Sequence, residues 1–144
     1  MKQSASSGSL WEDIVGYCRA VRINNVIEVA GTTAVDGEII IGQGNVYEQA
    51  IFIFTKIEKT LKQLGSSLQD VVRTRMFVTN IDDWEIIGKA HGEFFKNIKP
   101  VATMVEVSRL IDPGLLIEVE VTAIIDSDVS ALMINDSLSE GNSK

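Results

Sequence analysis

The chain has 144 residues, of which 45% are hydrophobic, and this is enough for one domain with a buried core. Its formal net charge of −7 argues against nucleic acid as a partner, because binding to a phosphate backbone requires a basic surface. No apolar run approaches the ~20 residues of a membrane span, so no membrane partner is expected. Cys18 is the single cysteine, which excludes an intramolecular disulfide and fits a cytoplasmic location.

The first part of the chain begins with a polar, serine-rich segment, residues 1–9, for which we expect a frayed end. Residues 17–31 then predict a β-hairpin. Two arms rich in apolar residues flank Asn24 and Asn25, and asparagine tolerates the left-handed conformation of tight turns. A short strand is expected at residues 38–41.

The strongest helical signal runs from Asn45 to Leu64, where apolar residues recur on one stripe. Asn45 and Glu48 form a predicted capping pair, and Gly65 stands where a helix would end. A strand is expected next, at residues 71–79. This order of strand, helix and strand predicts a right-handed crossover between neighbouring parallel strands.

A second helix is predicted from Asp83 to Asn97, with Asp82 as its N-cap and Glu85 as the capping-box partner. His91 lies on the inward stripe of this helix. We interpret it as a hydrogen-bonded core or interface residue rather than a catalyst. No second histidine or cysteine at ligand spacing supports a metal site, and no cofactor is expected.

Residues 99–126 predict two closing strands. In the second of them, Glu118 and Glu120 share one face while apolar residues occupy the other. The polar segment 127–144 is interpreted as a mobile tail. The expected organisation is therefore a single domain at residues 1–126.

These elements predict an α+β fold in which two helices pack on one face of a mixed sheet. The opposite face would carry charged and polar side chains among apolar neighbours. An exposed face of this kind favours association with other chains. Its predicted polar members are Arg19, Arg73, Arg75, Glu106, Glu118, Glu120 and Thr122.

Several short motifs resemble the Rid (YjgF) family of small trimeric proteins. The resemblance implies a chorismate-mutase-like homotrimer whose clefts between subunits bind a small molecule. It also implies the hydrolysis of reactive enamines and imines derived from amino acids, although some members are described as ribonucleases. The matching residues are Gly16-Tyr17, Ala20-Val21, Val29-Ala30-Gly31, Pro100, Val105-Glu106-Val107, Arg109-Leu110 and Ile117-Glu118-Val119-Glu120.

The resemblance also assigns candidate site residues. Glu118 matches the glutamate that positions the attacking water, while Tyr17 and Gly31 match residues that border the cleft. Thr103 stands where the family has a serine. Structural roles remain open for three of them: an ion pair for Glu118, interface packing for Tyr17, and a bulge or strand end at Gly31.

The main departure is Ala102, which stands where the family has the arginine that clamps the substrate carboxylate. Arg19 and Arg75 are cations where typical members are uncharged, and one of them could supply a relocated clamp. We favour the alternative that both join an ionic network with Glu28, Glu118 or Glu120.

Three functions therefore stay open. The first is a small-metabolite-binding trimer with altered or lost deaminase-type chemistry. The second is an active hydrolase of a C–N bond in a substrate that lacks the usual carboxylate. The third is a regulatory ligand-binding protein without turnover. A ribonuclease is disfavoured by the acidic charge.

Overall fold

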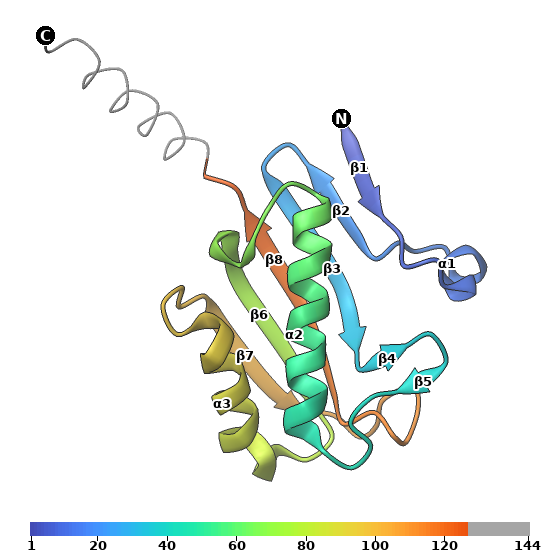
Figure 1. The fold of residues 1–144 in the computed structure, drawn as a ribbon, viewed down its shortest axis with the longest axis vertical. Helices are drawn as coiled ribbons and strands as arrows, with labels where there is room; N and C mark the ends of the chain where they lie inside the picture. Colours follow the sequence, from blue (N-terminus) through green and yellow to red (C-terminus); the bar gives the residue numbers. More distant parts are fainter. Residues whose placement is uncertain (127–144) are drawn as a thin grey trace, which may run out of the picture.

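A six-stranded mixed sheet carries the two long helices, α2 and α3, on one face (Figure 1). The computed structural model describes residues 1–126, and the segment predicted as a tail, 127–144, lies outside them. The α+β class is confirmed. The elements in chain order are β1 Lys2–Ala5, α1 Leu10–Val15, β2 Ala20–Ile23, β3 Val26–Thr33, β4 Val35–Asp36, β5 Ile39–Ile40, α2 Val46–Gln63, a 3₁₀ turn Leu68–Asp70, β6 Val71–Val78, a 3₁₀ turn Ile81–Asp83, α3 Trp84–Phe95, β7 Val101–Glu106 and β8 Ile117–Ile124.

The strand order is β1-β2-β3-β8-β6-β7, and only β6 and β7 run parallel among these neighbours. The predicted crossover between neighbouring parallel strands is therefore wrong for α2, because β8 lies between β3 and β6 and is antiparallel to both. The crossover between neighbouring parallel strands instead joins β6 to β7 through α3. Chain order alone does not show that the last strand enters the middle of the sheet.

The hairpin of β2 and β3 is confirmed, and Asn24 has the expected left-handed backbone with φ 53. The N-terminal segment is not frayed along its whole length, since β1 pairs with β2 from Lys2↔Ile23 to Ala5↔Ala20. A polar sequence can form this strand because an edge strand needs backbone pairing but little apolar surface. Ala5 supplies the one buried side chain.

The helix α2 begins as predicted, with the Asn45 side chain accepting a hydrogen bond from the Glu48 N–H at 3.0 Å. The predicted N-cap of the second helix is wrong. A 3₁₀ turn precedes α3, so the capping side chain is Asn80, which accepts from the Asp82 N–H at 3.0 Å. Both helices bury their apolar stripes against the sheet. The largest fully buried side chains of the two helices include Ile53, Phe54, Ile57, Leu61, Ile87 and Phe95.

His91 is a hydrogen-bonded residue between helix and sheet, as predicted. Its Nε2 lies 2.9 Å from Thr74 Oγ1, and its ring meets Phe54 edge to face with centroids 5.7 Å apart. Burial lowers the pKa of His91, since a half-buried imidazolium would lose hydration. This histidine therefore holds α3 against β6.

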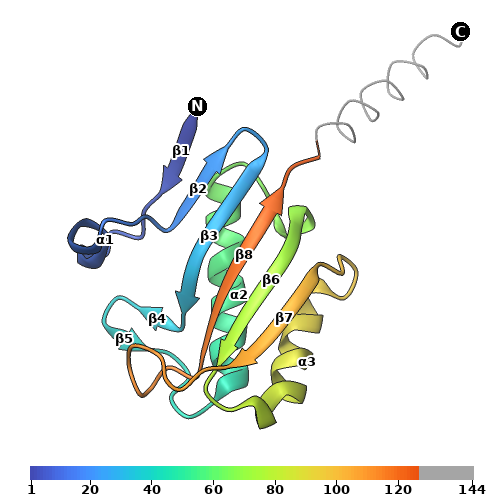
Figure 2. The same ribbon diagram turned by 180° about the vertical axis from the view of Figure 1, so that it is seen from behind.

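The face of the sheet opposite the helices is not covered by any helix of the described chain (Figure 2). Arg73, Arg75 and Phe77 of β6 face this side together with Glu118 and Glu120 of β8. Glu106 does not, contrary to the prediction. It pairs with Val78, lies on the helix side and accepts a hydrogen bond from the Ile81 N–H at 3.2 Å.

The register of β7 explains this difference, because Val101, Thr103 and Val105 are the residues of that strand that pair with Arg73, Arg75 and Phe77. Within residues 1–126, no helix combines the length and the apolar character needed to cross a bilayer.

Candidate functional site

The candidate site is centred on Gly31, at an irregularity in the pairing of β3 with β8. The register shifts between Val29 and Thr32, so Gly31 falls in a bulge. A Cβ atom on Gly31 would lie 2.6 Å from Glu118 Oε2 and 2.9 Å from Glu118 Cδ. The absent side chain therefore provides the space that the Glu118 carboxyl group occupies.

Glu118 lies in β8 between Thr33 of β3 and Phe77 of β6, and its side chain is half-buried. Burial raises the pKa of Glu118, the Arg19 guanidinium opposes this shift, and the Glu120 carboxylate adds to it. Glu118 thus binds a proton more readily than an exposed glutamate. A carboxyl group of this kind is suited to exchange a proton with a bound water.

Arg19 precedes β2 and reaches over to the same glycine. Its Nη2 donates to the Gly31 carbonyl at 2.6 Å, and its guanidinium carbon lies 6.0 Å from the centre of the Tyr17 ring. Its backbone N–H donates to the Ala5 carbonyl of β1 at 2.9 Å. Within residues 1–126, Arg19 Nε is buried and has no hydrogen-bond partner. A buried donor without a partner costs about 1–3 kcal/mol.

Arg75 and Glu120 face each other in the register of β6 and β8 and form an ion pair of 3.6 Å. Their side chains are 41% and 38% exposed, so this pair lies on the open face of the subunit. Of the ionic network that we favoured from the sequence for Arg19 and Arg75, the structure shows the single pair of Arg75 with Glu120, and among residues 1–126 Arg19 joins no ion pair. In the described part of the chain, Glu118 takes no part in an ion pair with Arg75.

Tyr17 is 40% exposed, and its ring lies near the Arg19 guanidinium that donates to the Gly31 carbonyl. Together with Cys18 it borders a shallow pocket formed with the start of α1, where Ser9 and Glu12 also contribute. The Glu12 carboxylate accepts hydrogen bonds from the N–H and hydroxyl groups of Ser7. This pocket places the tyrosine beside the N-terminal segment.

Thr103 and Ala102 lie apart from these residues, in the edge strand β7. Thr103 pairs with Arg75, and β6 separates β7 from β8 and Glu118. One subunit therefore brings together Tyr17, Arg19, Gly31 and Glu118 but not Thr103. Thr103 would come close to Glu118 only if strand β7 of another copy packed beside Glu118 of this one.

Lys56 is a neighbour of the site that the sequence analysis missed. It lies on α2, is half-buried and donates from Nζ to the Val35 carbonyl at 3.2 Å. Burial and the nearby Arg19 lower the pKa of Lys56, while Asp36 and Glu12 raise it. Its spacing of three residues from Ile53, on the buried stripe of α2, was the available signal.

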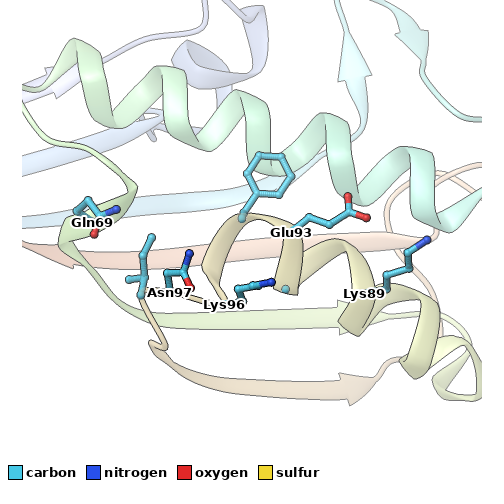
Figure 3. A pocket seen from close by; sticks show the side chains of 8 residues that line it. Gln69, Lys89, Glu93, Lys96 and Asn97 are labelled. Atoms are coloured by element: carbon cyan, nitrogen blue, oxygen red, sulfur yellow. The ribbon is translucent and has the colours of Figure 1, made fainter.

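A second hollow lies on the outer surface of α3 and contains none of the predicted site residues (Figure 3). Glu93 in this hollow already accepts a hydrogen bond from the Tyr47 hydroxyl at 2.7 Å, and Lys89 lies 5.4 Å from the Tyr47 ring centre. Because Glu93 and Lys89 have opposite charges and both already interact with Tyr47, this hollow shows no clear selectivity for a charged ligand. Among residues 1–126, no three side chains of the metal-binding types gather into a cluster.

The chain is similar to several known proteins. Residues 10–125 match the model of a family described as endoribonuclease L-PSP. An uncharacterised protein of Streptomyces coelicolor is 38% identical over 117 residues, which cover 81% of this chain and 87% of that protein. A RutC family protein of Pyrococcus abyssi is 34% identical over 110 residues, which cover 74% of this chain and 84% of that protein.

Two solved structures show the same architecture. A member of the YjgF/YER057c/UK114 family from Mycobacterium tuberculosis is 43% identical, with a TM-score of 0.79 over 87% of this chain and 100% of that one. A protein of the conserved Rid family from Yersinia pestis is 25% identical, with a TM-score of 0.75 over 87% of this chain and 100% of that one.

Proposed function

The chain belongs to the family described as endoribonuclease L-PSP, whose members also carry the names YjgF and RutC, and on this premise we propose a homotrimer that binds a small metabolite in clefts between subunits. The open sheet face supports this assembly, because it combines charged groups with exposed apolar side chains. Val101 and Val105 of β7 are 57% and 41% exposed on that side. A neighbouring copy would cover them and bring Thr103 toward Glu118.

We propose that the cleft hydrolyses the C–N bond of an imine or enamine. Water attacks the imine carbon, Glu118 takes the water proton, and the C=N electron pair moves to nitrogen. Glu118 then returns that proton to the nitrogen to give the carbinolamine. As the carbinolamine collapses to a carbonyl, its hydroxyl proton passes to the nitrogen and the C–N bond breaks, which releases ammonia. The observation that carries the proposal is the half-buried Glu118 carboxyl group, seated against Gly31 with a raised pKa.

The chemistry is altered relative to arginine-containing relatives, because Ala102 offers no donor to a substrate from β7. The same residue supports a second candidate, a regulatory protein that binds its ligand without turnover. We place ribonuclease activity last despite the family description, since a chain of net charge −7 lacks the basic surface that RNA requires.

Turnover of an imine generated in situ by an amino-acid oxidase tests the proposal, with release of ammonia as the measurement. Glu118→Gln keeps the shape of the side chain but cannot take a proton, so we expect its turnover to fall by about 10²-fold or more. Glu28→Gln is the matched control, because Glu28 lies on the same sheet face and accepts its hydrogen bond from the Thr122 hydroxyl. Equal turnover in both variants would contradict the role of Glu118.

A further inference from the structure

We propose that Arg19 binds the anionic group of the ligand, a role that the family resemblance gives to an arginine where this chain has Ala102. This inference rests on the proposed function, because it concerns the same cleft, and it adds the residue and the charge of the ligand. The ligand is then a small molecule with a carboxylate next to the C–N bond. The anion-binding group and the water-positioning glutamate belong to one subunit.

The first argument is the unused binding capacity of Arg19. Arginine carries five N–H donors in a planar fork that fits a carboxylate. Within residues 1–126, one hydrogen bond leaves the Arg19 side chain, to Gly31, and neither of the ion pairs includes it. Since its buried Nε has also lost contact with water, the charge is only partly compensated by solvation. The carboxylate of a ligand would supply further hydrogen-bond acceptors for the Arg19 guanidinium.

Two other arginines, Arg22 and Arg75, differ from Arg19 in having partners for their side chains. Arg22 lies in β2 and uses Nε for the Asn24 carbonyl at 2.9 Å and Nη1 for the Leu64 carbonyl at 2.6 Å. Arg75 has Glu120 as its counter-charge. Among residues 1–126, Arg19 makes no second backbone hydrogen bond and no ion pair, although the Glu118 carboxylate lies near enough to interact with it electrostatically. It is therefore the cation of the three that is available to a ligand.

The second argument is position. Arg19 and Glu118 share Gly31 as a neighbour: the arginine holds its carbonyl oxygen, and the glutamate fills the space of its missing side chain. In a 2-imino acid the carboxylate carbon is bonded directly to the imine carbon. A group that holds the carboxylate and a group that holds the attacking water must then lie side by side. Arg19 and Glu118 satisfy this condition.

The third argument is the presence of a second cation near Arg19. Lys56 lies close enough to Arg19 for each cation to feel the other, and both are anchored to backbone carbonyls, of Val35 and Gly31. Asp36 and Glu12 act on Lys56 and offset part of its charge. The Glu118 carboxylate acts on Arg19 as well, so Lys56 supplies a second half-buried cation near the site rather than a net positive charge.

Calorimetric binding of two probes to the purified full chain tests the inference. The probes are 2-oxobutanoate, which carries a carboxylate, and 2-oxobutanamide, its neutral analogue. We expect the wild-type protein to bind the carboxylate more tightly than the amide. Arg19→Met should weaken carboxylate binding by at least about tenfold, as the loss of a charge-assisted pair implies, and leave the amide unchanged. Arg19→Lys keeps the charge without the planar fork and should fall between the two.

Arg22→Met is the matched control, because it also removes a guanidinium that holds a backbone carbonyl at 2.6 Å. Its carboxylate affinity should stay within about twofold of wild type. If Arg19→Met fails to fold, the wild-type preference between the two probes and the Arg19→Lys result decide. Equal binding of both probes, no binding of 2-oxobutanoate, or full affinity in either Arg19 variant would each overturn the inference.

The inference and the proposed function fail in different ways. If Glu118→Gln loses turnover while Arg19→Met keeps carboxylate affinity, the hydrolytic function stands and Arg19 is not the anion-binding group. If Arg19→Met loses that affinity while Glu118→Gln keeps turnover, Arg19 binds the ligand and the role of Glu118 is wrong.

Discussion

The carboxyl group of Glu118 occupies the space in which a side chain on Gly31 would begin. This relationship gives a direct test of the site. In Gly31→Ala the new Cβ would meet Glu118 Oε2 at 2.6 Å and displace the carboxyl group. Because the displaced atoms end a flexible side chain, we expect a loss of stability of only about 1 kcal/mol, but a loss of turnover comparable with that of Glu118→Gln.

Thermal melts and the ammonia assay measure the two effects of Gly31→Ala. Gly92→Ala is the control, since a Cβ at Gly92 in α3 meets nothing within 4 Å and alanine favours a helix by up to about 1 kcal/mol. This control should melt slightly higher and keep its turnover. A Gly31→Ala variant that unfolds would mean that the bulge, and not the carboxyl group, is what this glycine serves.

The pH dependence of stability should report the raised pKa of Glu118. A carboxyl group whose pKa is higher in the folded state stabilises the fold below its unfolded pKa, and this contribution is lost as pH rises through the folded value. At neutral pH the buried charge is therefore unfavourable, and Glu118→Gln should melt higher than wild type. The difference should disappear at acid pH, where the wild-type side chain is protonated. A lower melting temperature for Glu118→Gln at pH 7 would show that the ionised group has a stabilising partner instead.

The same shift should appear in catalysis. Because Glu118 must be ionised to take the water proton, turnover should fall on the acid side at a pH above the ordinary glutamate value. A pH profile of turnover measures this limb. A profile whose acid limb lies at or below the ordinary glutamate value would contradict the assignment of Glu118 as the base.

The ion pair of Arg75 and Glu120 should contribute little to the stability of one subunit. Both side chains are about two-fifths exposed in the single subunit, so in a monomeric variant such as Val105→Asp we expect a coupling of about 0.2–1 kcal/mol. A double-mutant cycle with Arg75→Met and Glu120→Gln, followed by denaturant unfolding, measures it. The corresponding cycle with Glu118→Gln should be close to additive. Stronger coupling to Glu118 than to Glu120 would place Glu118 in the network and remove it from the cleft.

Assembly is the basis of the proposed cleft. Light scattering should give a mass of about three times 15.8 kDa. Val105→Asp places a charge on the open sheet face and should yield monomers, because Val105 would be covered by a neighbouring copy. Ile86→Asp is the control, since Ile86 is 38% exposed, close to the 41% of Val105, but lies on α3 in the helix layer. Trimers in both variants would move the interface away from β7.

Sequence patterns predicted the elements that are defined by contacts between residues close together in the chain. The helix α2 and its Asn45 cap follow from spacing within the helix, and the β2–β3 hairpin follows from residues around Asn24. The central position of β8 could not be predicted in this way, because it depends on pairing between residues far apart in the chain, such as Thr33 with Glu118. The start of α3 was missed for a different reason: a 3₁₀ turn capped by Asn80 precedes the helix, and the N-cap of α3 itself, Asp83, makes no side-chain cap hydrogen bond.

The site residues also divide into those that the sequence could predict and those that it could not. Glu118, Gly31 and Tyr17 were identified from motifs, and the structure brings them together around Arg19. The different states of Arg19 and Arg75 could not be separated in the sequence, where each is simply an arginine in or near a strand. Register decides between them, because β6 pairing places Arg75 opposite Glu120 while the bulge in β3 offers Arg19 only the Gly31 carbonyl.

If Arg19 binds the ligand as proposed, strand β1 links the amino-terminal segment to the binding site. Ala5 is the residue whose carbonyl receives the backbone N–H of Arg19, so the end of the chain fixes the point from which that side chain reaches the cleft. A purification tag or a trimmed N-terminus would then alter ligand affinity without touching any residue that meets the ligand. Protein preparations that differ only in their first five residues should be treated as different reagents.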